Sequence, residues 1–173
     1  MANYSTITLA GGIKAPRHRF TEPRPALATS PAFAAFEKLN DALADACAAE
    51  EFRMDPASWD MAHCDPDAAS EDAVNTALDL ARAAGNTPVV LAPDRMLIFV
   101  ARFIHCTLGL ESEPDRINML HLLENSQTLW HRSPNGLIAR RADELAGRAI
   151  ERLVRLTDLL YGDTCEEAAS PAP

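Results

Sequence analysis

One segment constrains the fold more than any other. The stretch from Pro93 to Gly109 is apolar around almost its whole circumference when it is drawn as a helix. A helix with this pattern is buried by other protein. Its uninterrupted apolar run, Met96 to Ala101, is too short to cross a bilayer and is closed by Arg102. We therefore expect a central apolar helix over about 93–109, with other helices packed around it.

Three polar side chains mark a narrow stripe on this helix. Arg95, Arg102 and His105 are seven and three residues apart, so they fall near one line along its surface. Buried cations need partners. Residues 37–79 carry twelve acidic side chains and two basic ones. We expect the stripe to face carboxylates from the first half of the chain or from a second subunit, and we interpret His105 as a structural histidine.

The composition favours an all-α protein. Only seven glycines and 6% aromatic residues accompany an apolar content of 47%, a balance typical of helices rather than sheets. A length of 173 residues suits one domain. We predict an irregular bundle of five to six helices over 30–162. A basic leader (1–29), extended or flexible, precedes it, and an acidic disordered tail (163–173) follows it.

Start and stop signals give approximate helix boundaries. Ser30 is the expected cap of the first helix, which runs to about residue 51, and Asp55-Pro56 starts a short helical turn through Trp59 and His63. The other predicted helices are Ser70 to Gly85, 93–109, a helix from about Ser112 or Pro114 to His131, and about 135–161. Residues 87–92 are expected to be a connector.

Small residues on the last predicted helix suggest close packing. Ala142, Ala146 and Ala149 would let a partner helix approach closely, and the apolar positions repeat over two undecads. Together with the nearly all-apolar central helix, this pattern predicts self-association through apolar helix faces, most simply as a homodimer.

The first predicted helix repeats one charge. Glu37, Asp41 and Asp45 follow each other at four-residue spacing and so share a side of the helix. This pattern is typical of a solvated face. The alternative is a docking surface for a basic partner.

The sequence offers only incomplete sets of candidate metal ligands. His121 and Glu124 share a helix face, whereas His131 on the same face would lie about 15 Å from His121, too far to bind the same ion. Asp60 and His63 have the same spacing and could supply further ligands. A metal-binding protein or metal-dependent helical enzyme is therefore the first alternative function.

The second alternative involves nucleic acid. The formal charge of -9 repels DNA, so binding would need a local patch of arginines, Arg132, Arg140, Arg141, Arg148, Arg152 and Arg155. Conversely, the acidic residues of 37–79 could imitate a phosphate backbone. No helix-turn-helix pattern supports DNA binding.

Known catalytic motifs are missing from the sequence. It contains no phosphate-binding glycine loop, no G-x-S-x-G elbow and no H-E-x-x-H pair. The four cysteines form no C-x-x-C pair and, with no signal-peptide pattern at the N-terminus, favour a cytoplasmic protein with reduced thiols. We expect no cofactor, no membrane partner and no enzymatic activity. The leading prediction is an accessory or regulatory protein that acts through protein–protein interaction and self-association.

Overall fold

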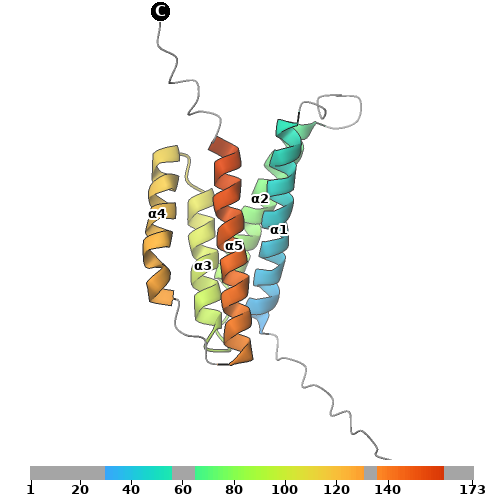
Figure 1. The fold of residues 1–173 in the computed structure, drawn as a ribbon. Helices are drawn as coiled ribbons and strands as arrows, with labels where there is room; N and C mark the ends of the chain where they lie inside the picture. The colour runs from blue at the N-terminus through green and yellow to red at the C-terminus, as the bar shows by residue number, and fades with distance from the viewer. Residues whose placement is uncertain (1–29, 56–64, 131–135, 162–173) are drawn as a thin grey trace, which may run out of the picture.

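The protein is an up-and-down arrangement of helices (Figure 1). The computed structural model describes residues 30–55, 65–130 and 136–161, except the side chains of residues 124 and 126–130. These residues form no strand, which confirms the all-α prediction. Their five helices are α1 (Pro31–Met54), α2 (Pro66–Gly85), α3 (Asp94–Leu108), α4 (Glu113–Trp130) and α5 (Leu137–Tyr161).

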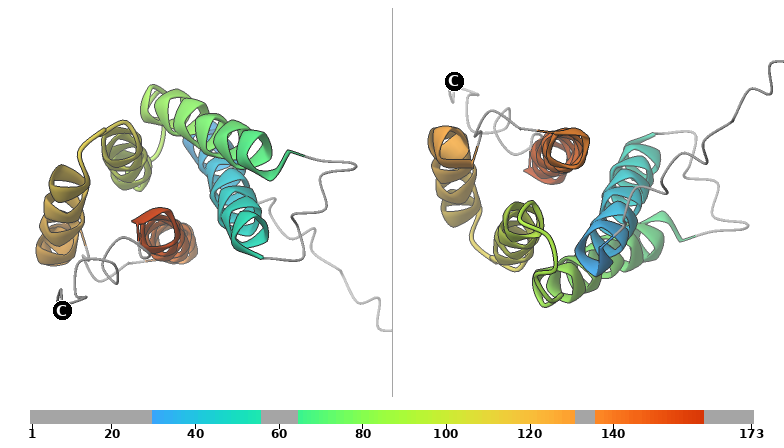
Figure 2. Two further views of the ribbon diagram at one scale, coloured as in Figure 1. Left: turned by 90° about the horizontal axis from the view of Figure 1, so that it is seen from above. Right: turned by 90° about the horizontal axis from the view of Figure 1, so that it is seen from below.

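Four of the helices close a ring, and the fifth lies outside it. α1 packs on α2, α2 on α3, α3 on α5 and α5 on α1, whereas the main packing partner of α4 is α3 (Figure 2). Because α4 brings the chain back down before α5 begins, α1, α3 and α5 all run in the same direction (Figure 1). The core is formed mainly inside the ring, and Leu123 of α4 joins it.

The start of α1 follows the predicted capping pattern. Ser30 accepts a hydrogen bond from the Phe33 amide at 3.3 Å, and Pro31 occupies the first turn, where no amide donor is lost. The apolar stripe that follows is buried, with Phe33, Phe36, Leu39 and Leu43 almost inaccessible to solvent.

The start of α2 differs from the prediction. The helix begins at Pro66 rather than at Ser70, because the Asp65 carboxylate accepts from the amides of Asp67 and Ala68 and Pro66 fits the first turn. Asp65-Pro66 therefore starts a helix instead of ending one. The short turn predicted through Trp59 and His63 lies outside the described residues.

A buried aspartate fixes the start of α3. Asp94 is inaccessible to solvent and accepts from the Ser30 hydroxyl at 2.6 Å, the Val90 amide at 2.8 Å and the Leu91 amide at 2.7 Å. The carboxylate thus joins the beginnings of α1 and α3 and orders the residues before α3. Residues 87–92 form no strand and connect α2 to α3, as predicted.

The small residues of α5 allow close packing, but inside the chain. Ala142, Ala146 and Ala149 are buried in the core, and side chains of α1 reach the α5 backbone. The Asn40 amide donates to the Leu145 carbonyl at 3.1 Å, and the Cys47 thiol contacts the carbonyl oxygen of Arg152 at 3.4 Å. The alanine face of α5 is therefore used by α1 within one chain and is not available for a dimer.

Two of the predicted segments are not among these helices. The leader (1–29) and the tail (163–173) are outside the described residues. Within the described ranges, none of the helices combines the length and apolarity needed to span a membrane.

Candidate interaction surface

The exposed side of α3 carries a mixed basic and aromatic stripe. Arg95, Phe99, Arg102 and Cys106 are exposed and follow each other at spacings of four, three and four residues. The other sides of α3 are buried, as the apolar pattern predicted. Phe99 is the exception, because it belongs to the apolar run yet is 54% exposed. Its position, four residues after Arg95 and three before Arg102, places it on the polar side.

The end of α2 supports one edge of this stripe. Arg102 Nε donates to the Gly85 carbonyl at 2.8 Å, which satisfies a backbone oxygen at the C-terminus of α2. A Cβ atom at Gly85 would lie only 2.8 Å from Arg102 Cγ, so this contact depends on glycine. Arg82 Nε donates to His105 Nε2 at 3.2 Å. His105 therefore has a structural partner at its Nε2 atom.

The stripe does not meet carboxylates within the described part of the chain. Arg95 makes no ion pair there, Arg102 contacts a carbonyl, and His105 contacts another cationic side chain. The expected pairing with the first half of the chain is therefore not found in these ranges. The expected pairing with a second subunit stays a prediction.

The acidic repeat of α1 is divided between α5 and solvent. Glu37 pairs with Arg141, whereas Asp41 and Asp45 are exposed. Further along the same two helices, Arg155 pairs with Glu51 at 2.5 Å.

These contacts use arginines that were considered for DNA binding. Arg141, Arg152 and Arg155 all contact α1, with Arg152 donating to Asn40, so their charges serve the α1–α5 packing. Arg140 and Arg148 are exposed, and Arg132 lies outside the described residues. The same pairing reduces the free acidic surface that a DNA mimic would need, since Glu37 and Glu51 are engaged.

Among the described side chains, α4 buries fewer than the other helices do. Of its described side chains only Leu123 is buried, while Ile117 and Leu122 are 43% and 56% exposed. Arg116 extends over the Tyr161 ring of α5 at 4.7 Å from the ring centroid. Burial lowers the pKa of the Arg116 guanidinium, and its Nε atom has no hydrogen-bond partner among the described residues.

The candidate metal ligands are not brought together. His121 is exposed on α4, the side chain of Glu124 and both Asp60 and His63 lie outside what the structure describes, and no group of three or more potential ligands occurs among the described residues. The metal alternative therefore stays a prediction. Elemental analysis of untagged protein tests it, because stoichiometric metal is required.

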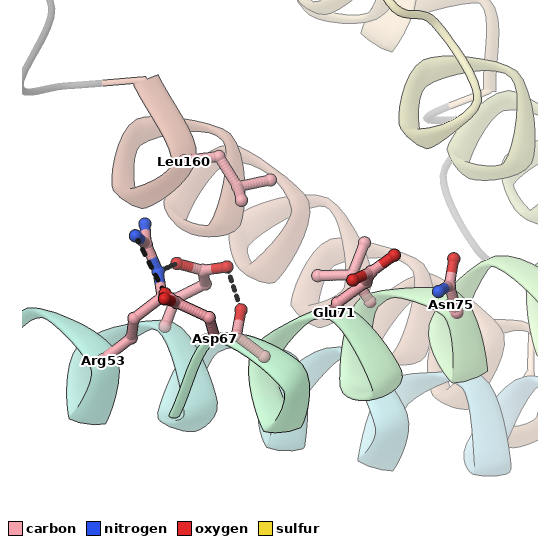
Figure 3. A pocket seen from close by; sticks show the side chains of 8 residues that line it. Arg53, Asp67, Glu71, Asn75 and Leu160 are labelled. Atoms are coloured by element: carbon pink, nitrogen blue, oxygen red, sulfur yellow. Dashed lines mark hydrogen bonds and ion pairs between the residues drawn. The ribbon is translucent and has the colours of Figure 1, made fainter. Parts of the chain in front are cut away.

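A pocket of about 310 Å³ opens where α1 ends and α2 begins (Figure 3). Arg53 and Asp67 meet at its edge at 3.9 Å, and Leu160 of α5 lies across from them. Deeper in, Glu50 accepts from the Ser70 hydroxyl and from Arg53 Nε at 2.8 Å.

The Glu50–Ser70 pair superficially resembles a base beside a nucleophile. Both residues are only 2% exposed, and Arg53 occupies the second carboxylate oxygen. The pair therefore ties α1 to α2. Sequence reasoning missed it because Ser70 fitted a helix cap equally well.

No protein-family model, curated protein or solved structure matches this chain.

Proposed function

We propose that the protein is a non-enzymatic accessory or regulatory protein that acts through protein–protein interaction, beginning with self-association as a dimer. One observation carries this proposal. The outer side of α3 and the neighbouring α4 expose large apolar side chains, Phe99, Ile117 and Leu122, although the four-helix ring has already buried its own core. Large exposed apolar side chains on neighbouring helices are typical of interaction sites.

The arrangement supports an interaction role better than a catalytic one. The most enclosed polar group, Glu50 with Ser70, is engaged inside the protein, and His105 is held by Arg82. By contrast, the exposure of Ile117 and Leu122 on α4 is unfavourable for the isolated chain, because apolar area in contact with water costs about 25 cal/mol per Å².

Sedimentation equilibrium at micromolar concentration tests the proposal. We expect a mass of twice 18.8 kDa for the wild type. Phe99→Ser should weaken the dimer, because it removes an exposed aromatic side chain from the proposed interface.

Phe52→Ser is the matched control. Phe52 is 48% exposed at the end of α1, close to the 54% of Phe99, and this substitution should leave the mass unchanged. A wild-type protein that sediments only at 18.8 kDa would contradict the proposal.

A further inference from the structure

The outer face of α2, α3 and α4 has opposite charges at its two ends. α3 lies between α2 and α4 in both end views (Figure 2). α2 ends and α3 begins at the lower end of the molecule, whereas α3 ends and α4 begins at the upper end (Figure 1). We define the outer face by its exposed residues at these places and along α3 between them: Arg82, Arg95, Phe99, Arg102, Cys106, Glu111 and Asp115.

The lower half of the outer face is basic. Arg82 is in the last turn of α2 and Arg95 in the first turn of α3, and Arg102 follows two turns later. Only Asp79 offers a nearby carboxylate among the described residues, at 4.0 Å from Arg82, and both of these side chains are largely exposed, so the pair is weak.

The upper half is acidic. Glu111, Glu113 and Asp115 follow one another at the α3–α4 junction, and Glu111 and Asp115 are exposed. The next basic residue, Arg116, does not neutralise them at the surface, because its side chain extends over Tyr161. The first turn of α4 also favours these negative charges through the helix dipole.

We infer that two copies of this chain pair through the outer face across a two-fold axis perpendicular to the helices, so that Arg95 of each copy meets Glu111 of the other. Such an axis exchanges the upper and lower ends, and a two-fold interface uses the same patch on both subunits. This inference rests on the proposed self-association and specifies its surface.

The register of the stripe fits this arrangement. Phe99 lies four residues inward from Arg95, and Cys106 lies five residues inward from Glu111. Phe99 and Cys106 are both within α3, which ends at Leu108, and with a rise of about 1.5 Å per residue they lie about 10 Å apart along the helix. In each copy both apolar side chains lie between Arg95 and Glu111, and so inside the two ion pairs, which is the usual division between an interface core and its rim.

A second copy suits the face better than another partner does. A nucleic acid or an acidic peptide would match the lower half but be repelled by Glu111 and Asp115. A basic partner would have the opposite difficulty with Arg95. In the two-fold pairing Arg102 of each copy lies near the axis, and its bond to the Gly85 carbonyl holds its side chain against α2 of its own subunit. Each subunit carries a net charge of -9, so local complementarity must also offset the mutual repulsion of the two copies.

Charge reversal with complementation tests this pairing. Arg95 and Glu111 are exposed and make no ion pair among the described residues, so Arg95→Glu and Glu111→Arg should both fold. Each variant alone places like charges opposite one another twice per dimer, and its dissociation constant should rise at least about tenfold. An equimolar mixture should regain association, because both contacts of the mixed dimer pair opposite charges: the introduced glutamate meets the introduced arginine, and the native Arg95 of one subunit meets the native Glu111 of the other.

Arg140→Glu serves as the control. Arg140 is exposed on α5, away from the outer face, and this variant should associate like the wild type. If the wild type is a dimer but Arg95→Glu and Glu111→Arg associate equally well, or if their mixture regains nothing, the pairing is wrong and self-association itself stands. If the wild type is a monomer, both proposals are overturned.

Discussion

Among single residues, Asp94 has the largest structural role outside the apolar core. Its carboxylate accepts from one hydroxyl and two backbone amides and is inaccessible to solvent. Sequence reasoning assigned it no role, because an acidic residue in the first turn of a helix is common and its partner, Ser30, is distant in sequence. The pairing could be recognised only once α1 and α3 were placed side by side.

Asp94→Ala should lower the free energy of unfolding by about 2–4 kcal/mol, because it removes three hydrogen bonds and leaves donors without an acceptor. Asp41→Ala, an exposed change on α1, is the control and should stay within about 0.5 kcal/mol of the wild type. Urea unfolding followed by circular dichroism measures both. A loss for Asp94→Ala as small as that for Asp41→Ala would show that the network contributes little.

Cys47 and Cys106 should differ sharply in reactivity. Burial raises the pKa of the Cys47 thiol, and the nearby charge of Arg155 opposes this effect only in part, whereas Cys106 is exposed. Iodoacetamide labelling of the Arg95→Glu variant at low concentration, followed by peptide mass spectrometry, should modify Cys106 before Cys47. Equal rates would mean that α1 and α5 separate readily.

The raised pKa of Cys47 also predicts a pH dependence. A neutral thiol is favoured in the folded state, so its contribution to stability is present below the unfolded-state pKa of about 8.5 and is lost as pH rises through the folded-state pKa. The stability difference between wild type and Cys47→Ala should therefore shrink at alkaline pH. A difference that grows with pH would contradict this assignment.

The sequence predicted the presence of the helices better than the residues at which they begin. The apolar periodicity of α1, α3 and α5 is long and regular, and these helices appear close to their predicted bounds. The start of α2 was placed four residues late, because Asp65-Pro66 can either end one helix or cap the next. Only the hydrogen bonds of Asp65 to the following amides distinguish the two.

Two glycines provide a test of helix packing. A Cβ atom added at Gly147 would meet no atom within 4 Å outside its own helical backbone, so Gly147→Ala should stabilise the protein by up to about 1 kcal/mol through helix propensity. Gly85→Ala should destabilise it, since the new methyl group would collide with Arg102 and strain its bond to the Gly85 carbonyl. Thermal unfolding of both variants gives the comparison, and equal shifts would show that Arg102 yields without cost.

At the scale of the whole molecule, sequence patterns could not say which apolar faces remain available. The alanine face of α5 and most of α3 were candidates for dimerisation, but α1 and the rest of the ring cover them. The position of α4 decides what is left, and its weakly amphipathic sequence gave no strong signal of where it packs. The exposed Phe99 was predictable in principle, because it shares a line with Arg95 and Arg102.

Charge distribution belongs to this scale as well. The acidic repeat of α1 was expected to face solvent or a basic partner, yet Glu37 pairs with Arg141 of α5. Such contacts between parallel helices about a hundred residues apart in sequence depend on topology. The separation of charge along the outer face likewise follows from the directions of α3 and α4 rather than from any local motif.

Hydroxyl-radical footprinting at concentrations above and below the dimer dissociation constant tests the central claim most directly, because it reports on individual side chains. We expect oxidation of Phe99 and Cys106 to fall on assembly, while Phe52 and Leu137, exposed on α1 and α5, stay equally reactive. Protection of Phe52 or Leu137 without protection of Phe99, or no dependence on concentration, would contradict an interface on the outer face.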